Sequence, residues 1–190
     1  MTGQPGPGAA KSEWRQWARR QWGRVDAAAL SQLLVEQLAA AALLDEPGTI
    51  MLYFPMDGEL DLTALVERLP GPVVVTATRT PASGPLTLHR VEGEAMEDHA
   101  YGFRQPVATA TSVDPAEIDV ALVPGLCFAR DGTRLGHGAG YFDEFLARCR
   151  AGAVLVGVAA DKLLVERLPR QPHDIAMTHL ASESGVRPIG

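Results

Sequence analysis

Hydrophobic residues occur along the chain in two patterns, short continuous apolar runs and longer stretches with a helical repeat. The apolar runs predict buried strands at residues 49–54, 72–78, 118–124 and 153–159, and an alternating stretch predicts another strand at 85–91. Outside these runs, apolar side chains that recur every three or four positions predict helices at 11–24, 31–44, 60–69 and 142–150. Residues 92–117 are mixed and polar and predict no element.

The helical repeat also indicates which helix faces are buried. Trp14 and Trp17 lie three positions apart in the first helix and share one face. The second and fourth helices have equivalent apolar faces, formed by Leu34, Leu38 and Ala41 and by Phe142, Phe145, Leu146 and Cys149.

Strands that alternate with amphipathic helices predict an α/β fold, here a three-layer α/β/α sandwich around a mostly parallel sheet. The 190 residues suffice for one domain with a substantial core. We expect this domain to span residues 11–190, because no repeat or change of composition marks a linker. Residues 1–10 contain Gly and Pro without periodicity and predict a flexible tail.

Composition and charge limit the kinds of molecule that this protein is expected to bind. The apolar content of 46% and charged content of 21% are typical of a globular protein. A net charge of −6 argues against a nucleic-acid or membrane-surface partner, although a small anion can still bind a local basic cluster. Cys127 and Cys149 lack zinc or disulfide spacing. With no signal-peptide pattern and no run of about 18 apolar residues, we expect a cytoplasmic protein, and nothing demands more than a monomer.

The stretch 134–143, RLGHGAGYFD, is the first candidate for chemistry. Its glycines, Gly136, Gly138 and Gly140, allow positive φ angles and a close approach of the backbone to a ligand. The stretch leads directly into a predicted helix, whose N-terminal N–H groups attract anions. A phosphate-binding loop is one interpretation, and a glycine-rich connecting turn is the other.

Asp143 favours the phosphate interpretation. A carboxylate beside bound phosphate would be repelled unless a cation lay between them, and Mg²⁺ is commonly held by one or two carboxylates together with phosphate oxygens. The alternative is an acidic residue of the first helical turn, stabilised by the helix dipole.

The longer segment VPGLCFARDGTRLGHGAGYFDEFL, residues 123–146, resembles the 5-formyltetrahydrofolate cyclo-ligase (5,10-methenyltetrahydrofolate synthetase) family. That family has a PGLxFxxxGxRLGxGxGYYDxxL segment. The resemblance extends to Lys11 and Arg15, which match a KxxxR motif, to YFPMDGELD at 53–61 and to HDIAMTHL at 173–180.

The resemblance implies a reaction. Members of this family use ATP to cyclise 5-formyltetrahydrofolate to 5,10-methenyltetrahydrofolate, with release of ADP and phosphate. Transfer of the γ-phosphoryl group to the formyl oxygen makes that oxygen a leaving group, and N10 of the folate then attacks the formyl carbon. Such a reaction needs positioning and charge neutralisation rather than a protein nucleophile.

The resemblance also implies roles for individual residues. Catalysis is assigned to Lys11, Arg134 and Asp143, Mg²⁺ to Asp143 and Asp174, and the folate substrate to Phe54, Glu59 and Tyr141. ATP is assigned to Lys11, Arg15, Arg134, Leu135, Gly136, His137, Gly138, Ala139, Gly140, Tyr141 and Phe142. Structural alternatives remain open: Lys11 and Arg15 as a solvated helix face, Phe54 as a core residue, and Tyr141 and Phe142 as packing residues.

The sequence departs from the family pattern at several positions, and these leave other functions open. His137 occupies a variable loop position, Phe142 replaces a tyrosine, Leu163 a glutamine, and His179 a glutamate. The alternatives are a related ATP-dependent ligase or kinase with another small-molecule substrate, and a non-catalytic nucleotide-binding module.

Overall fold

The computed structural model describes residues 3–6, 8–45 and 48–190. Its main feature is an eight-stranded sheet with the strand order β13-β12-β10-β7-β1-β2-β3-β6. The five central strands, from β12 to β2, are parallel, and antiparallel strands complete both edges. The strands of this sheet are β1 (Thr49–Leu52), β2 (Val74–Arg79), β3 (Thr87–Arg90), β6 (Ser112–Val113), β7 (Val120–Pro124), β10 (Val154–Val158), β12 (His179–Ser182) and β13 (Gly185–Pro188). The predicted α/β fold with a mostly parallel sheet is confirmed.

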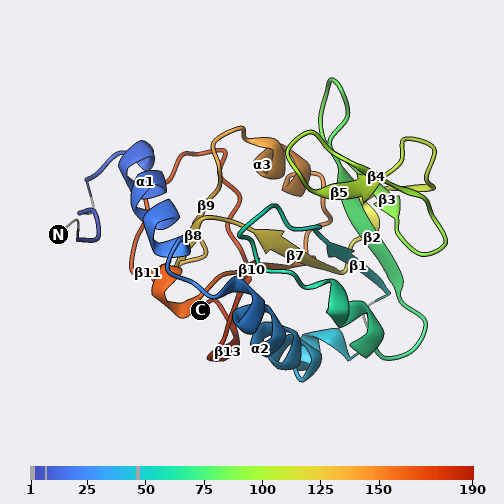
Figure 1. Cartoon of the computed structure of the whole chain (residues 1–190), viewed down its shortest axis with the longest axis horizontal. Helices are drawn as coiled ribbons and strands as arrows, with labels where there is room; N and C mark the ends of the chain where they lie inside the picture. The colour runs from blue at the N-terminus through green and yellow to red at the C-terminus, as the bar shows by residue number, and fades with distance from the viewer. Residues whose placement is uncertain (1–2, 7, 46–47) are drawn as a thin grey trace.

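Helices lie on both sides of this sheet, as Figure 1 shows. Helix α2 (Ala27–Ala39) packs against β12, β13 and the 3-10 helix η2 (Thr63–Arg68), and α3 (Tyr141–Leu146) lies on the other side of the sheet. Helix α1 (Lys11–Trp22) lies near one end of the molecule, where the Trp22 indole donates to the Leu126 carbonyl at 2.9 Å. The remaining 3-10 helices are η1 (Ala42–Leu44), η3 (Pro115–Glu117) and η4 (Asp161–Leu163).

Two smaller sheets lie beside the large one. One has the order β11-β8-β9, formed by Leu164–Val165, Cys127–Ala129 and Arg134–Leu135. The other is a hairpin of β4 (Met96–Asp98) and β5 (Arg104–Pro106), which contacts β2. Strand β9 ends where the glycine loop begins, so the small sheet holds the start of that loop.

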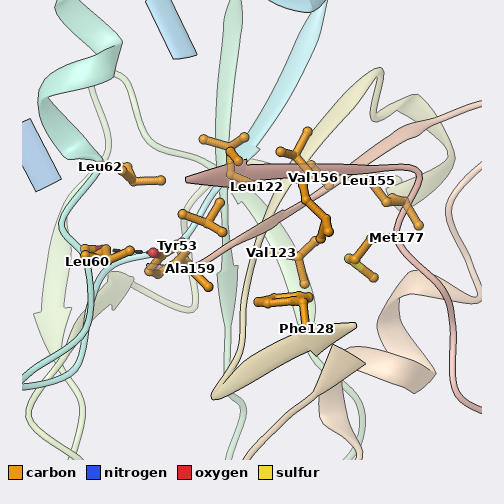
Figure 2. Close-up of a cluster of buried hydrophobic side chains, with 14 of the residues drawn as sticks. Tyr53, Leu60, Leu62, Leu122, Val123, Phe128, Leu155, Val156, Ala159 and Met177 are labelled. Atoms are coloured by element: carbon orange, nitrogen blue, oxygen red, sulfur yellow. Dashed lines mark hydrogen bonds between the residues drawn. The ribbon is translucent and has the colours of Figure 1, made fainter. Parts of the chain in front are cut away.

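The core joins the large sheet to the small one through Phe128 of β8 (Figure 2). A Cβ atom at Gly157, in the middle of β10, would lie only 2.5 Å from the Phe128 ring and 3.0 Å from Met177. Glycine is therefore required there, because the aromatic ring occupies the space that a side chain would fill. The predicted buried faces are largely confirmed. No more than 5% of the surface is exposed at Trp14, Trp17, Leu34 and Leu38.

The structure corrects several predicted boundaries. The helix predicted at 60–69 is the 3-10 helix η2, and the one predicted at 142–150 ends at Leu146. Beyond it, Arg148 and Cys149 donate to carbonyls three residues back, so the chain continues in tighter turns. The second helix starts at Ala27, capped by the Asp26 carboxylate, and leaves Ala41 outside. Residues 1, 2 and 7 of the predicted tail lie outside the described residues.

Candidate active site

A pocket of about 410 Å³ lies beyond the carboxyl ends of β1 and β7. These strands are neighbours in the sheet, but the chain continues from β1 to β2 on one side and from β7 to β10 on the other. This is a topological switch point, where loops diverge and leave a crevice. Phe54, which follows β1, and Pro124, the last residue of β7, both line the pocket.

Every residue predicted to belong to the site lines this single pocket. They come from four separate parts of the chain: α1, the loop after β1, the segment from β9 through the glycine loop to the start of α3, and the segment before β12. The residues are Lys11, Arg15, Phe54, Glu59, Arg134, Leu135, Gly136, His137, Gly138, Ala139, Gly140, Tyr141, Phe142, Asp143 and Asp174. The structure thus brings together residues that lie as far apart in sequence as Lys11 and Asp174.

The glycine loop has the backbone freedom that its sequence indicates. Gly138 and Gly140 adopt φ angles of +113° and +77°. No described residue accepts a hydrogen bond from the amides of residues 136–140, so these N–H groups remain available to a ligand. Helix α3 has only six residues, and its dipole contributes less than the predicted longer helix would. The anion-binding capacity of this loop therefore rests on its own amides and nearby cations.

Helix α1 brings two cations to the pocket, and one of them contacts the glycine loop. Its buried face holds Trp14, Trp17 and Ala18, and Lys11 and Arg15 lie next to that face. The Arg15 Nε donates to the Gly136 carbonyl at 3.0 Å. A Cβ atom at Gly138 would lie 3.2 Å from the Arg15 guanidinium carbon, so this arginine lies directly against the loop.

Each predicted metal ligand forms an ion pair with a predicted phosphate ligand. Lys11 Nζ lies 2.6 and 2.8 Å from the two Asp174 oxygens, and Arg134 Nη2 lies 2.9 Å from Asp143 Oδ2. Burial alone would raise the pKa of Asp174, but hydrogen bonds from Lys11 and the Gln171 amide lower it below its usual value. In this structure, the two carboxylates of the site are therefore each paired with one cation.

Arg134 is the most deeply buried of these charged groups. Its side chain is 5% exposed, and burial lowers the pKa of its guanidinium despite the favourable charge of Asp143. The Nε atom has no partner among the described residues, and the group also lies 5.5 Å from the centre of the Phe142 ring. Besides Asp143, the Pro124 carbonyl accepts from this guanidinium at 3.4 Å, and the remaining N–H groups leave the buried cation with unused hydrogen-bonding capacity.

The donor set at this end of the pocket suits a hard divalent cation. Asp143 Oδ1 accepts from the amide of Ile175 at 3.3 Å, which brings Asp143 next to Asp174. Among the described residues there is no cluster of three or more side chains that would hold a metal alone. Two carboxylates that rely on further oxygen ligands are the arrangement expected for Mg²⁺ bound together with phosphate.

The middle of the pocket is formed by the loop after β1. Glu59 accepts from the Met56 amide at 3.0 Å, and its other oxygen lies 3.4 Å from Nε2 of His137 on the glycine loop. Phe54 is half-buried and lines the pocket, outside the hydrophobic core cluster. Tyr141 is 44% exposed, whereas Phe142 packs partly against the core.

Sequence reasoning missed the far end of the pocket, which the β4–β5 hairpin forms. Tyr101, Phe103 and Arg104 line it, and the His99 ring stacks on Phe103 at a centroid distance of 4.5 Å. The available signal was the group of aromatic residues within 99–103, which lies in a polar stretch with no periodicity. Other lining residues that were missed are Tyr53, Met56, Thr78, Thr80, Leu86, Pro124, Gln171 and His173.

The model of the 5-formyltetrahydrofolate cyclo-ligase family matches residues 9–183. The chain belongs to this family. Among curated relatives, the 5-formyltetrahydrofolate cyclo-ligase of Mycolicibacterium smegmatis is 33% identical over 139 residues, covering 70% of this chain and 72% of the relative. The corresponding protein of Haemophilus influenzae is 28% identical and covers 81% and 88% of the two chains.

Solved structures agree with this family membership. The 5,10-methenyltetrahydrofolate synthetase of Aquifex aeolicus superimposes with a TM-score of 0.82 at 30% identity, over 94% of this chain and 92% of that one. The Mycoplasma pneumoniae synthetase has the same fold, with a TM-score of 0.75 at 19% identity over 92% and 99% of the chains. The predicted cyclo-ligase family, enzyme class and fold are confirmed. No helix among the described residues is long and apolar enough to cross a membrane.

Two of the departures from the family pattern lie away from the site. Leu163 is fully buried in η4 as part of the core, and His179 pairs with β10 and β13 in the sheet. Neither side chain is among the described residues that line the pocket. They therefore do not alter the pocket wall directly.

Proposed function

We propose that this protein cyclises 5-formyltetrahydrofolate to 5,10-methenyltetrahydrofolate with consumption of ATP and release of ADP and phosphate. The observation that carries the proposal is the convergence of Lys11, Arg15 and Arg134, the free loop amides and two adjacent carboxylates on one pocket. Family membership supplies the substrate, since the matching model and relatives are named for 5-formyltetrahydrofolate.

The chemistry needs two groups held in line. The formyl oxygen attacks the γ-phosphorus and the bond to ADP breaks, which gives a phosphorylated formyl group. The N10 nitrogen then attacks the formyl carbon, phosphate leaves with the former formyl oxygen, and N10 loses its proton. Each step places negative charge on phosphoryl oxygens, so cations and N–H donors fixed around those oxygens lower the barrier.

Residues in different parts of the pocket have different roles in this reaction. The amides of 136–140 and Arg15 bind the ATP phosphates, and Lys11 and Arg134 neutralise the charge that develops during transfer. Leu135, Tyr141 and Phe142 complete the ATP site. The predicted substrate contacts fall beside it: Glu59 accepts paired N–H donors from the aminopyrimidinone ring of the folate, and Phe54 and Tyr141 pack against the same substrate.

Asp143 and Asp174 are the residues that would hold Mg²⁺. When bound there, Mg²⁺ would supply positive charge that offsets the negative charge of the ATP phosphates. The ion pairs of the structure fit this role, because Asp174 and Asp143 already lie beside two cations that would bind phosphate, Lys11 and Arg134.

An optical assay tests the proposal directly. The methenyl product absorbs in the near ultraviolet where the formyl substrate does not, so protein, ATP, Mg²⁺ and 5-formyltetrahydrofolate should give rising absorbance. Omission of ATP, or removal of Mg²⁺ with a chelator, should abolish the signal. No absorbance change with the complete mixture would contradict the proposal. ADP release with another acceptor would then indicate a related ligase or kinase, and ATP binding without turnover a nucleotide-binding module.

Four further properties of the protein remain predictions. They are a single domain over residues 11–190 with a flexible tail at 1–10, a monomer, and a cytoplasmic location. Cys127 and Cys149 are free thiols, which suits a reducing compartment.

A further inference from the structure

Two arginines of the hairpin region differ in how they are used. Arg79, at the end of β2, is 15% exposed and its guanidinium lies 2.7 Å from Glu97 of β4. Arg104, the first residue of β5, is exposed, lines the pocket and forms no ion pair with any described residue. Its register partner on β4 is Asp98, yet no ion pair joins them. The first arginine holds the hairpin to the sheet, whereas the second presents a free cation to the pocket.

The order of strands in the sheet indicates the order of the binding residues along the pocket. The glycine loop follows β7 through the small sheet, Glu59 follows β1, and the hairpin packs beside β2. The strand order β7-β1-β2 therefore places Glu59 and Phe54 between the phosphate-binding loop and the hairpin. The Thr80 amide, just after β2, donates to the Gln105 side chain in the middle of β5 at 3.0 Å, which fixes β5 to the end of β2.

We propose that Arg104 binds a carboxylate of the glutamyl end of the folate substrate. This inference rests on the proposed function. If the pterin ring lies against Glu59 with its formyl group toward the phosphate loop, the rest of the molecule extends toward the hairpin. There Tyr101 and Phe103 offer rings that suit an aminobenzoyl group, and Arg104 offers a cation that suits a carboxylate.

Arginine matches this task better than other cations. Its planar guanidinium donates two parallel hydrogen bonds to one carboxylate, and it keeps its charge at all physiological pH values. Because Arg104 is exposed, its contribution depends on ionic strength. The residue selects for the glutamyl group and takes no part in phosphoryl transfer.

The experiment compares two substrates that differ only at this end. Steady-state formation of the methenyl product is measured with 5-formyltetrahydrofolate and with 5-formyltetrahydropteroate, which lacks the glutamate. The proteins are the unaltered full chain, Arg104→Gln, Arg104→Lys and the control Arg90→Gln. Arg90 is an exposed arginine on the neighbouring strand β3 and does not line the pocket.

We expect Arg104→Gln to raise KM for 5-formyltetrahydrofolate about tenfold, as for the loss of a charge-assisted hydrogen bond, with kcat unchanged within about twofold. KM for the pteroate and for ATP should stay the same, and Arg104→Lys should give an intermediate value. Arg90→Gln should match the unaltered chain. The KM of the unaltered chain for 5-formyltetrahydrofolate should also rise more with added salt than that of Arg104→Gln.

The remaining outcomes overturn the inference. An equal rise in KM for both folates would indicate that Arg104 only supports the hairpin, and no change in either would indicate no role in binding. A rise in KM for ATP alone would place the nucleotide at this end of the pocket. If the unaltered chain formed no methenyl product from either substrate, the proposed function itself would fail, which separates the two cases.

Discussion

The two ends of the pocket hold their charged groups in opposite ways. At the phosphate end, Lys11 and Arg134 are paired with carboxylates, and the Arg134 side chain is only 5% exposed. At the hairpin end, Arg104 is exposed and unpaired among the described residues, and Tyr101 is 73% exposed. A paired and buried set of charges keeps its geometry before any ligand arrives, whereas an exposed set gains its order on binding.

This difference matches the demands of the proposed reaction at each end. Phosphoryl transfer depends on charges that are already in place, because reorganisation during the reaction would raise the barrier. Recognition of a flexible glutamyl group makes no such demand, since it contributes affinity and not rate. Substitutions at the phosphate end should therefore reduce kcat, and those at the hairpin end should raise KM.

The largest effect is expected for Asp143→Ala. Loss of this carboxylate removes a proposed Mg²⁺ ligand, and kcat should fall by at least about 10³-fold. The same change leaves the buried Arg134 guanidinium without its 2.9 Å partner, so the free energy of unfolding should also fall, by about 1–3 kcal/mol. Turnover at ordinary Mg²⁺ concentration and urea denaturation measure the two effects separately.

Glu144→Gln is the matched control for that substitution. Glu144 is the next residue of the same helix, is exposed, and does not line the pocket. It should retain both activity and stability. If Asp143→Ala kept near-normal turnover at ordinary Mg²⁺ concentration, the assigned metal role would be wrong, and the ion pair with Arg134 would be purely structural.

Gly138→Val should have the next largest effect. The φ angle of +113° is unfavourable for valine, and the new Cβ would lie 3.2 Å from the Arg15 guanidinium carbon. We expect KM for ATP to rise about tenfold or more, together with a strain of about 1–2 kcal/mol. ATP binding by calorimetry measures the first effect, and thermal denaturation the second.

Gly93→Val separates strain from crowding in that experiment. Gly93 has a φ angle of +71° and lies in a turn before β4, and a Cβ atom added there would have no neighbouring atom within 4 Å. It should lose similar stability while binding ATP normally. Equal ATP affinity in the two variants would contradict the idea that the glycine loop surrounds phosphate.

The phosphate end could be predicted from sequence because its chemistry is local. Gly136, Gly138, Gly140 and Asp143 lie within eight residues, and a resemblance to a known family added Lys11, Arg15 and Asp174. The partners of these residues could not be predicted. The Lys11–Asp174 pair joins segments 163 positions apart, and only the packing of α1 beside the segment before β12 brings them together.

The hairpin end was not predictable for a related reason. Strands β4 and β5 have three residues each, too short for an alternating pattern to emerge from a polar stretch. The strands near the C-terminus, β12 and β13, were also missed, although their pairing with β10 completes the sheet. The central strands were identified because burial on both faces makes them continuous apolar runs.

A smaller effect is expected for Tyr101→Ala at the hairpin end. Since the side chain is 73% exposed, its removal should change the free energy of unfolding by less than about 0.5 kcal/mol. Loss of an aromatic contact worth about 0.5–1.5 kcal/mol should raise KM for 5-formyltetrahydrofolate roughly two- to tenfold, with kcat unchanged. Tyr101→Phe keeps the ring and should behave normally. A fall in kcat without a change in KM would remove the contrast between the two ends.

The mildest test concerns the rigidity of the scaffold beneath the phosphate end. Cys127 lies in β8, which pairs with β9 at the start of the glycine loop, and burial raises the pKa of its thiol to about 12. At pH 8 only about one thiol in 10⁴ is then ionised, so Cys127 should resist iodoacetamide in the folded protein and react in urea. Cys149 is half-buried and should react first, and Cys149→Ser leaves Cys127 as the single thiol for mass spectrometry. Rapid labelling of Cys127 in that variant would mean that β8 opens readily, and the phosphate end could not then be the preorganised part of the pocket.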